Sequence, residues 1–169
     1  MKAGTRALGL AESHTGDGDV STLAGAVVRV DRAVDGFSFS TCTVGGTDAT
    51  DAAIRLWTDL DRPDVRYVLV AGVALAWYNL LDPTALSEAT DRPVVAVSFE
   101  ASDGLEPPIR DAFDGDAMER RLAAYRALPD RHRLDVNGET VYVRSVGTDD
   151  PDALVRAYTP EGGRPDPLR

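Results

Sequence analysis

The sequence is poor in the residues that crosslink chains or hold transition metals, with one cysteine and two histidines among 169 residues. The single cysteine, Cys42, excludes an intramolecular disulfide and a multi-cysteine zinc site, and it fits a reducing compartment. We expect it to be a small buried residue. His14 and His132 are isolated, without a partner at zinc-ligand spacing. The composition therefore does not support a zinc-dependent or disulfide-stabilised protein.

Long hydrophobic runs are also absent. The longest uncharged run, residues 67–81, is shorter than the roughly 18 to 20 residues that span a bilayer, and Tyr78 and Asn79 interrupt it. The opening stretch, MKAGTRALGL, lacks the apolar core and cleavage site of a signal peptide. We therefore expect a cytoplasmic protein with no membrane partner, and the sequence indicates no particular oligomeric state.

Basic residues are scarce, with 18 Lys and Arg against 28 Asp and Glu, a formal net charge of −10, and Lys2 as the only lysine. Such an acid excess keeps a protein hydrated through self-repulsion and is a property of halophilic, salt-adapted proteins. It weighs against nucleic-acid binding by bulk electrostatic attraction, which needs Lys and Arg. In molar salt, however, the Debye length is about 3 Å. Local contacts would then decide binding.

The hydrophobic pattern predicts one α/β domain over residues 1–169, beginning with three antiparallel strands. The first strand is expected at residues 6–11, and the next two flank a turn at Asp35 and Gly36. Helical spacing follows, with Thr47 or Asp48 as the cap of the first helix.

The second half predicts the remaining helices and a late hairpin. A strand at residues 67–71 is apolar on both faces, and a helix near Pro83 and the strand PVVAVSF complete a β-α-β unit. Two helical stretches split at Asp114-Gly115, a hairpin turns at Asn137-Gly138, and a last helix starts at Pro151. The tail, residues 159–169, is expected to be extended or frayed.

Several stretches in this order resemble an archaeal family, endonuclease dU, that is itself similar to endonuclease V. They are RALGLAES, STCTVGGTDAT, YVLVAGVALAWYNLLD, RPVVAVSFE, VYVRSVG and GRPDPLR. The resemblance implies a ribonuclease-H-like fold, a mixed sheet flanked by helices. It also implies a role in DNA repair, through metal-dependent cleavage of DNA that carries a deaminated base such as uracil. Such cleavage uses carboxylates at adjacent strand ends to hold Mg²⁺ or Mn²⁺.

The sequence departs from the family where those metal ligands are expected. The positions that the resemblance assigns to carboxylates match Ala11, Gly45 and Ala71 here. A methyl group or a hydrogen cannot bind a metal ion. The expected catalytic centre therefore lacks its acids, although Glu12 lies directly beside one of the lost positions.

Two acids remain as candidate catalytic residues. Glu12 could act as a shifted metal ligand, but neighbouring strand residues point to opposite faces, which favours a glutamate in solvent. Asp48 could lie near the same crevice, yet capping a helix, worth about 1 kcal/mol, is the more common role.

Four residues after the central strand are candidates for substrate binding: Trp77, Tyr78, Asn79 and Asp82. The two aromatics could stack on a base or simply cover the sheet edge. Asn79 and Asp82 could line a pocket for a flipped base, or form a turn with Asp82 as a helix cap before Pro83. The locally basic stretch at residues 119–133 is expected to be a solvated surface, because its arginines point in different directions on a helix.

Three functional hypotheses follow. The first is a nucleic-acid-associated member of the family with a degenerate nuclease centre, whose partner is DNA with deaminated bases. The second is an active Mg²⁺- or Mn²⁺-dependent endonuclease with a site rebuilt from Glu12, Asp48 and Asp17 or Asp19. The third is a small-ligand or protein-interaction module on the same scaffold.

Overall fold

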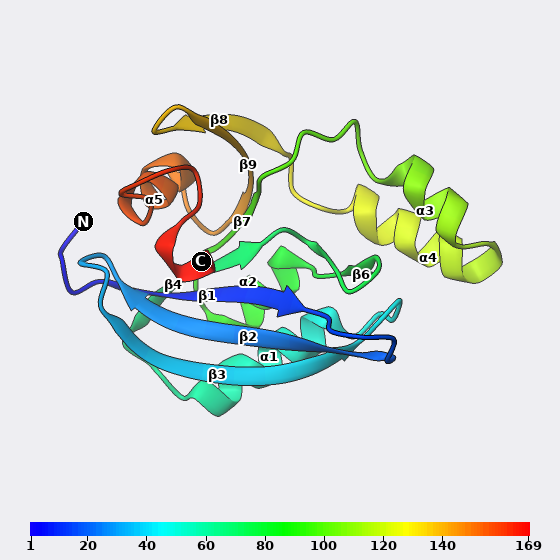
Figure 1. The fold of residues 1–169 in the computed structure, drawn as a ribbon, viewed down its shortest axis with the longest axis horizontal. Coiled ribbons are helices and arrows are strands. Elements are labelled where there is room, and N and C mark those ends of the chain that lie inside the picture. The colour runs from blue at the N-terminus through cyan, green and yellow to red at the C-terminus, as the bar shows by residue number, and fades with distance from the viewer.

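The computed structural model describes residues 1–169, and its centre is a seven-stranded mixed sheet (Figure 1). Across the sheet the order is β3-β2-β1-β4-β7-β9-β8. In chain order these strands are β1 (Arg6–Ser13), β2 (Val20–Arg29), β3 (Val34–Thr43), β4 (Val65–Ala71), β7 (Val94–Ser98), β8 (His132–Val136) and β9 (Glu139–Val146). β1 runs parallel to β4, and β4 to β7, while the outer pairs are antiparallel. The predicted opening meander, β-α-β unit and late hairpin are confirmed.

Helices cover both faces of the sheet. α1 (Ala49–Leu60) and α2 (Pro83–Thr90) pack on one side, which we call the α1 face, and α5 (Pro151–Ala157) packs on the other, the α5 face. α3 (Glu106–Ala112) and α4 (Gly115–Arg126) form an arm that projects beyond the sheet at the right of Figure 1. No helix combines the length and hydrophobicity needed to cross a bilayer.

Alternation along the central strands divides the core between the two faces. Leu8 and Leu10 of β1 belong to the cluster beneath α1 and α2, whereas Ala7 belongs to the cluster beneath α5. In β4, Val70 lies on the α1 face and Leu69 on the α5 face. Because successive strand side chains point to opposite faces, even-numbered β1 positions face α1 and odd-numbered ones face α5.

The start of α2 follows the sequence prediction, while the start of α1 does not. Asp82 accepts hydrogen bonds from the backbone N–H groups of Thr84 (2.9 Å) and Ala85 (3.2 Å), so it is the expected cap. Asp48 stands at the cap position of α1, but its side chain makes no capping bond. Asn79 instead accepts from the N–H of Ala49 at 2.9 Å. A residue distant in sequence therefore supplies the cap.

The prediction of an extended or frayed tail was wrong. A 3₁₀ turn, η1 (Asp166–Leu168), packs on β1, β2 and β4, and Leu168 is 2% exposed. The contact is so close at Gly9 that an added Cβ would lie 1.9 Å from the carbonyl oxygen of Pro167. The tail is thus part of the α5-face core, held by hydrophobic burial and a backbone bond from Asp166 to Tyr158 of 2.7 Å.

Candidate functional site

Two of the positions that lack a carboxylate lie side by side at the ends of the central strands. The parallel pairing of β1 with β4 ends at Leu10 and Val70, so Ala11 and Ala71 are the next residues on adjacent strands. Both are odd-numbered positions, so their side chains point to the α5 face, and Ala71 packs against the core on that side. Adjacent strands are about 5 Å apart. Acids at these two positions could have shared one metal ion.

A shallow cavity of about 280 Å³, the strand-end crevice, opens beside Ala71. Its lining consists of Ala71, Gly72, Val97, Ser98, Phe99, Glu100 and Arg164. The Arg164 guanidinium lies 4.2 Å from the centre of the Phe99 ring and donates to the carbonyl of Leu168 at 3.3 Å. The tail therefore places a cation, and the end of β7 an aromatic ring, beside the position where carboxylates are expected.

The residues present do not fit Mg²⁺ or Mn²⁺ at this place. Such ions are bound mainly by carboxylate oxygens, and Glu100 is the one acid that lines the crevice. No group of three or more His, Cys, Asp or Glu side chains lies close enough anywhere in the chain to hold a metal ion. Arg164 adds a positive charge that would repel a divalent cation.

Glu12 lies on the opposite face of the sheet from Ala11 and Ala71. Its carboxylate accepts a hydrogen bond from the buried hydroxyl of Ser21. Ser21 pairs with Cys42, a member of the α1-face core, so this contact is on the α1 side. The sequence argument about opposite faces is therefore confirmed, but Glu12 is a partly buried strand residue rather than a residue in a solvated loop.

Asp48 is engaged in a network at the end of β3. Its carboxylate accepts from the backbone N–H and the hydroxyl of Thr43, both at 2.9 Å, and from the Asn79 amide at 2.7 Å. Burial would raise the pKa of Asp48, but these hydrogen bonds outweigh it and lower the pKa below its ordinary value. Asp48 thus remains an ionised anchor within the protein.

The charges of Glu12 and Asp48 both act on one residue, Cys42. Burial raises the pKa of the Cys42 thiol, and the negative charges of Asp48 and then Glu12 raise it further. Cys42 is buried, as predicted. Glu12 and Asp48 therefore act electrostatically on a thiol of the α1-face core. Asp17 and Asp19 lie exposed in the loop between β1 and β2. The structure does not bring these acids to the strand-end crevice.

Asn79 has little capacity left for a ligand. It is fully buried, its oxygen accepts from Ala49, and its amide donates to the Thr43 carbonyl (2.8 Å) and to Asp48. Both amide protons are in use. The geometry therefore gives Asn79 the role of joining α1, β3 and the segment after β4.

Trp77 and Tyr78 form the tip of a small hairpin between β5 (Ala74–Leu75) and β6 (Asn79–Leu80), which the sequence suggested only as an aromatic loop. Both residues, and Ala76 before them, have positive φ angles of 59°, 56° and 36°, respectively. Such conformations cost of order 1–3 kcal/mol each and cluster at functional sites. Trp77 is 60% exposed. The fold thus holds an aromatic side chain in solvent on strained backbone.

Contacts between aromatic rings connect this hairpin to Phe113, which lies between α3 and α4 in the projecting arm. The rings of Trp77 and Tyr78 meet edge to face at 5.3 Å, and Tyr78 meets Phe113 at 6.2 Å. Arg121 lies 3.8 Å over Phe113 and donates to the carbonyls of Gly45 and Gly46. The third expected acid position, Gly45, lies in a turn next to Trp77, since a Cβ there would lie 3.4 Å from the Trp77 ring. We call Trp77, Tyr78 and Phe113 the aromatic platform.

The prediction of a solvated basic surface over residues 119–133 was wrong in part. Arg121 is 6% exposed. Burial lowers its pKa, and the positive charge of Arg120 lowers the pKa further. Arg126 pairs with Glu106 at 2.8 Å. Arg131 lines a second cavity, of about 290 Å³, on the α1 face.

This second cavity was not anticipated as a site. Its lining comes from the ends of β4 and β7, from β9 and from the projecting arm: Gly72, Val73, Ala74, Ala96, Ser98, Glu100, Ser102, Gly104, Leu105, Tyr125, Arg131, Tyr142 and Arg144. Two of its residues, Tyr142 and Arg144, lie in the stretch VYVRSVG that carries part of the resemblance. The stretches YVLVAGVALAWYNLLD and RPVVAVSFE contribute lining residues as well, among them Gly72, Ala96 and Ser98. These stretches were the available signal, since alternate residues of a strand share one face.

Comparison with known proteins gives a consistent result. The family model described as Endonuclease dU matches residues 3–169. The UPF0215 protein of Pyrobaculum calidifontis is 35% identical over 167 residues, which cover 96% of this chain and 90% of the relative.

Solved structures share the fold. A protein of unknown function from Archaeoglobus fulgidus superposes with a TM-score of 0.84 at 26% identity, covering 98% of this chain and 92% of that one. Endonuclease V of Ciona intestinalis, in complex with a DNA containing an inosine, gives a TM-score of 0.60 at 10% identity, covering 97% and 81%. The endonuclease-V-like, ribonuclease-H-like fold class is thereby confirmed. From the match along residues 3–169 and the similarity to the Pyrobaculum protein, the chain belongs to the Endonuclease dU family.

Proposed function

We propose that this protein binds DNA containing a deaminated base without cleaving it. The observation that carries the proposal is the lining of the strand-end crevice, where Ala71 stands at an expected acid position and Phe99 and Arg164 line the space beside it. An aromatic ring and a guanidinium suit a base and a phosphodiester, whereas a nuclease centre requires oxygen ligands for metal ions. The chain has the scaffold of the family, and the crevice lacks the set of oxygen ligands that a nuclease centre requires.

Two surfaces would contact the nucleic acid. Arg164, exposed on the tail, would donate to a phosphate oxygen at the crevice. Trp77, at the tip of the aromatic platform, would stack on a base, an interaction worth about 1–3 kcal/mol. Tyr78 would position Trp77 through their edge-to-face contact, and Asp82 and Asn79 would hold the hairpin.

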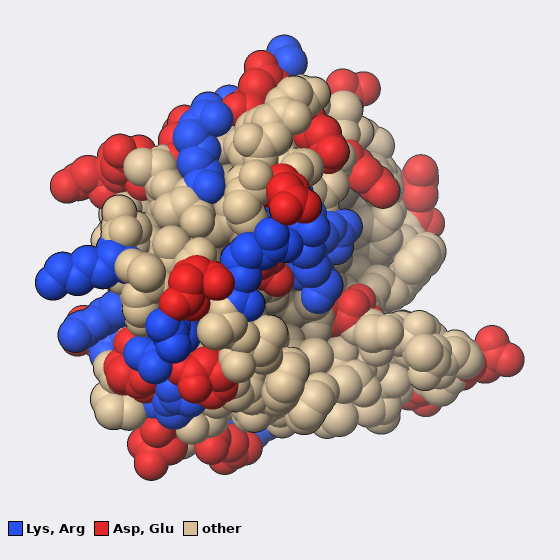
Figure 2. Space-filling model, turned by 60° about the vertical axis from the view of Figure 1, so that its left-hand side comes forward, with Lys and Arg blue, Asp and Glu red and all other residues tan.

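The charge distribution favours local contacts over a long basic track. On the face in Figure 2, most of the Lys and Arg side chains lie close to Asp and Glu side chains. Affinity should therefore depend less on salt than it does for proteins that neutralise many phosphates, whose binding falls about 10³- to 10⁵-fold between 50 and 200 mM salt.

The preference for a deaminated base is inferred from the family and from a structural neighbour. The family is described as Endonuclease dU, and the structural neighbour from Ciona intestinalis holds a DNA containing an inosine. We therefore expect a preference for uracil or hypoxanthine over the unmodified base.

A cleavage assay separates binding from catalysis. Oligonucleotides carrying deoxyuridine, deoxyinosine or neither are incubated with the protein in high potassium chloride with Mn²⁺ or Mg²⁺. We expect binding without nicking. Uracil-dependent nicking that is lost in Glu12→Gln but kept in Glu88→Gln, which changes an exposed glutamate, would instead establish the enzyme with a site rebuilt around Glu12 and Asp48.

A binding assay tests the platform. Trp77→Ala should weaken binding of a uracil-containing oligonucleotide about tenfold, because one stacked base is lost. The matched control is Phe39→Ala, which removes an equally exposed ring, 63% accessible, from β3. Equal affinities of both variants and the wild type would contradict the role of Trp77. No affinity of the wild type for any oligonucleotide would overturn the proposed function itself.

A further inference from the structure

Two arginines on the α1-face cavity lack acidic partners, although acids outnumber bases by 28 to 18. Neither Arg131 nor Arg144 has a carboxylate oxygen within 4.0 Å, whereas many other arginines in the chain do. Both side chains are partly buried and line the same cavity of about 290 Å³. Partly desolvated cations without counterions are costly. An anionic ligand would provide the missing charge.

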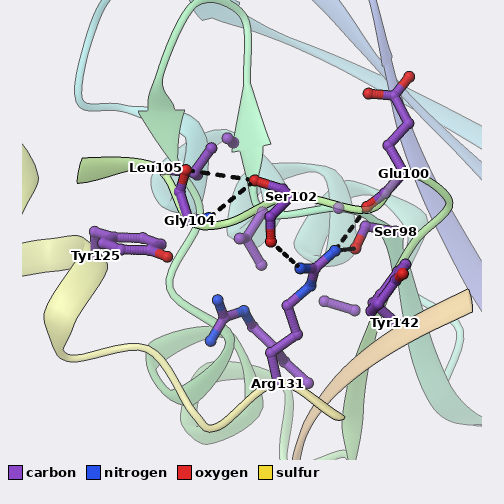
Figure 3. Close-up of a pocket in the computed structure, with 13 residues that line it drawn as sticks. Ser98, Glu100, Ser102, Gly104, Leu105, Tyr125, Arg131 and Tyr142 are labelled. Carbon is purple, nitrogen blue, oxygen red and sulfur yellow. Dashed lines mark hydrogen bonds between the residues drawn. The ribbon is translucent and has the colours of Figure 1, made fainter. Parts of the chain in front are cut away.

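The Arg131 side chain is fixed in place by the loop after β7. Its guanidinium donates to the carbonyls of Ser102 (3.1 Å) and Glu100 (2.7 Å), and to the Ser98 hydroxyl (3.4 Å). It also stacks 3.9 Å over the ring of Tyr142. Figure 3 shows these bonds, and it shows the Glu100 carboxylate directed away from Arg131. The arginine is therefore oriented by neutral groups, and none of these partners offsets its positive charge.

Arg144 approaches the same space from β9. It pairs across the sheet with Ala96, so it shares the α1 face with Ala96 and the cavity. It donates to the carbonyl of Pro129, and its guanidinium carbon lies 5.8 Å from the centre of the Tyr125 ring. A guanidinium has five N–H donors, so several remain for a ligand.

Hydroxyl groups complete the set of donors. Ser98 accepts from Arg131, which leaves its own proton free, and Tyr125 and Tyr142 stand on opposite sides of Arg131 in Figure 3. A set of donors with two positive charges suits an oxyanion that accepts several hydrogen bonds. A phosphate monoester, with three terminal oxygens and about two negative charges, matches this better than a single carboxylate does.

We propose that the cavity around Arg131 and Arg144 is a binding site for a small phosphate monoester. The cavity lies on the α1 face, opposite the side chains of Ala71 and Phe99, and meets the strand-end crevice only at Gly72, Ser98 and Glu100. At about 290 Å³ it is at the lower end of ligand-pocket volumes. It therefore accommodates a phosphate with one small organic group attached, such as a mononucleotide. It is too small for an oligonucleotide.

Calorimetry with the full chain tests the site. The probes are inorganic phosphate, deoxyuridine monophosphate and unphosphorylated deoxyuridine, each in potassium chloride solution. We expect both phosphates to bind and deoxyuridine not to bind. Tighter binding of the mononucleotide than of phosphate would identify an organic phosphate as the ligand, and equal binding would identify free phosphate. Binding of deoxyuridine as tight as that of its monophosphate would overturn the proposal.

Variants locate the binding. Arg144→Gln should weaken phosphate binding at least about tenfold, since a hydrogen bond from a charged donor is lost, and Arg144→Lys should lose less. Arg120→Gln removes an exposed charge outside the cavity and serves as the matched control. Equal weakening by Arg144→Gln and Arg120→Gln would refute the site as a whole. Because the probes are mononucleotides and phosphate, failure here leaves oligonucleotide binding at the crevice unaffected.

The pH dependence gives an independent readout. The second proton of a phosphate monoester leaves at a pKa near 6, so affinity should rise several-fold between pH 5 and pH 7. Sulfate, which is a dianion throughout this range, should show no such rise. An affinity for deoxyuridine monophosphate that does not change over this range would contradict recognition of the dianion.

Discussion

Replacing Gly9 by alanine should detach the C-terminal tail. The added Cβ would lie 1.9 Å from the Pro167 oxygen and 2.4 Å from its carbonyl carbon. Real Cβ contacts do not fall below 3.0 Å, so the backbone of η1 must move by more than 1 Å. Because this neighbour is main chain in a packed turn, it cannot simply rotate away.

The size of the effect follows from what the tail buries. Losing the burial of Leu168 costs about 1.5–3 kcal/mol, and losing the bond from Asp166 to Tyr158 adds about 0.5–1.5 kcal/mol. With part of Pro167 also exposed, Gly9→Ala should lower the unfolding free energy by about 3–5 kcal/mol. For a chain of this length that corresponds to a fall in Tm of roughly 10 °C.

Thermal unfolding followed by circular dichroism in high potassium chloride measures this loss. Gly18→Ala is the matched control, because a Cβ there meets nothing within 4 Å. Leu168→Ala in the Gly9→Ala background should add almost nothing, since the side chain is already released. A loss below about 1 kcal/mol for Gly9→Ala, or full additivity with Leu168→Ala, would refute the reasoning.

Three further variants test other parts of the structure. Asn79→Ala leaves the buried N–H of Ala49 unpaired and should cost about 1–3 kcal/mol in urea unfolding; an unchanged midpoint would exclude the capping role. Hydrogen bonds from Arg62 hold the pKa of Asp64 at about 2. Arg62→Gln should therefore raise that pKa, which an NMR titration of the Asp64 carboxyl would measure. This stabilisation is present above about pH 4 and is lost as pH falls toward about 2. The stability gap between wild type and variant should shrink over that range, and a constant gap would contradict the assignment. Trp77→Ala should change the unfolding free energy by less than about 1 kcal/mol, as its ring is mostly exposed; a larger loss would show that the ring is part of the core.

The local patterns of the sequence predicted most of the elements. Asn137-Gly138 forms the turn of the late hairpin, with φ angles of 51° and 83°, as expected for that dipeptide. Asp82 caps α2 as predicted. This cap could be recognised from the sequence because Asp82 and Pro83 are adjacent residues. Alternation along β1 also placed Glu12 on the face opposite Ala11.

The contacts that failed prediction join residues distant in sequence. Asn79 caps α1 from 30 positions away, and Tyr158 donates through its hydroxyl to the Thr5 carbonyl from 153 positions away. Local periodicity carries no information about such partners. The arginine cavity is of this kind only in part. The β8–β9 hairpin, in which His132 pairs with Val143, already brings Arg131 close to Arg144, whereas the other walls of the cavity come from β4, β7 and the projecting arm.

The packing of η1 on β1 also sets an order for folding during synthesis. Residues 6–13 are synthesised well before residues 166–168, which cover one face of that strand. At about 5–20 residues per second, translation separates the two events by roughly 10–30 s. During that interval the α5 side of β1 has no cover from this segment. The nascent chain should therefore be more vulnerable to aggregation and proteolysis until residues 166–168 have been synthesised.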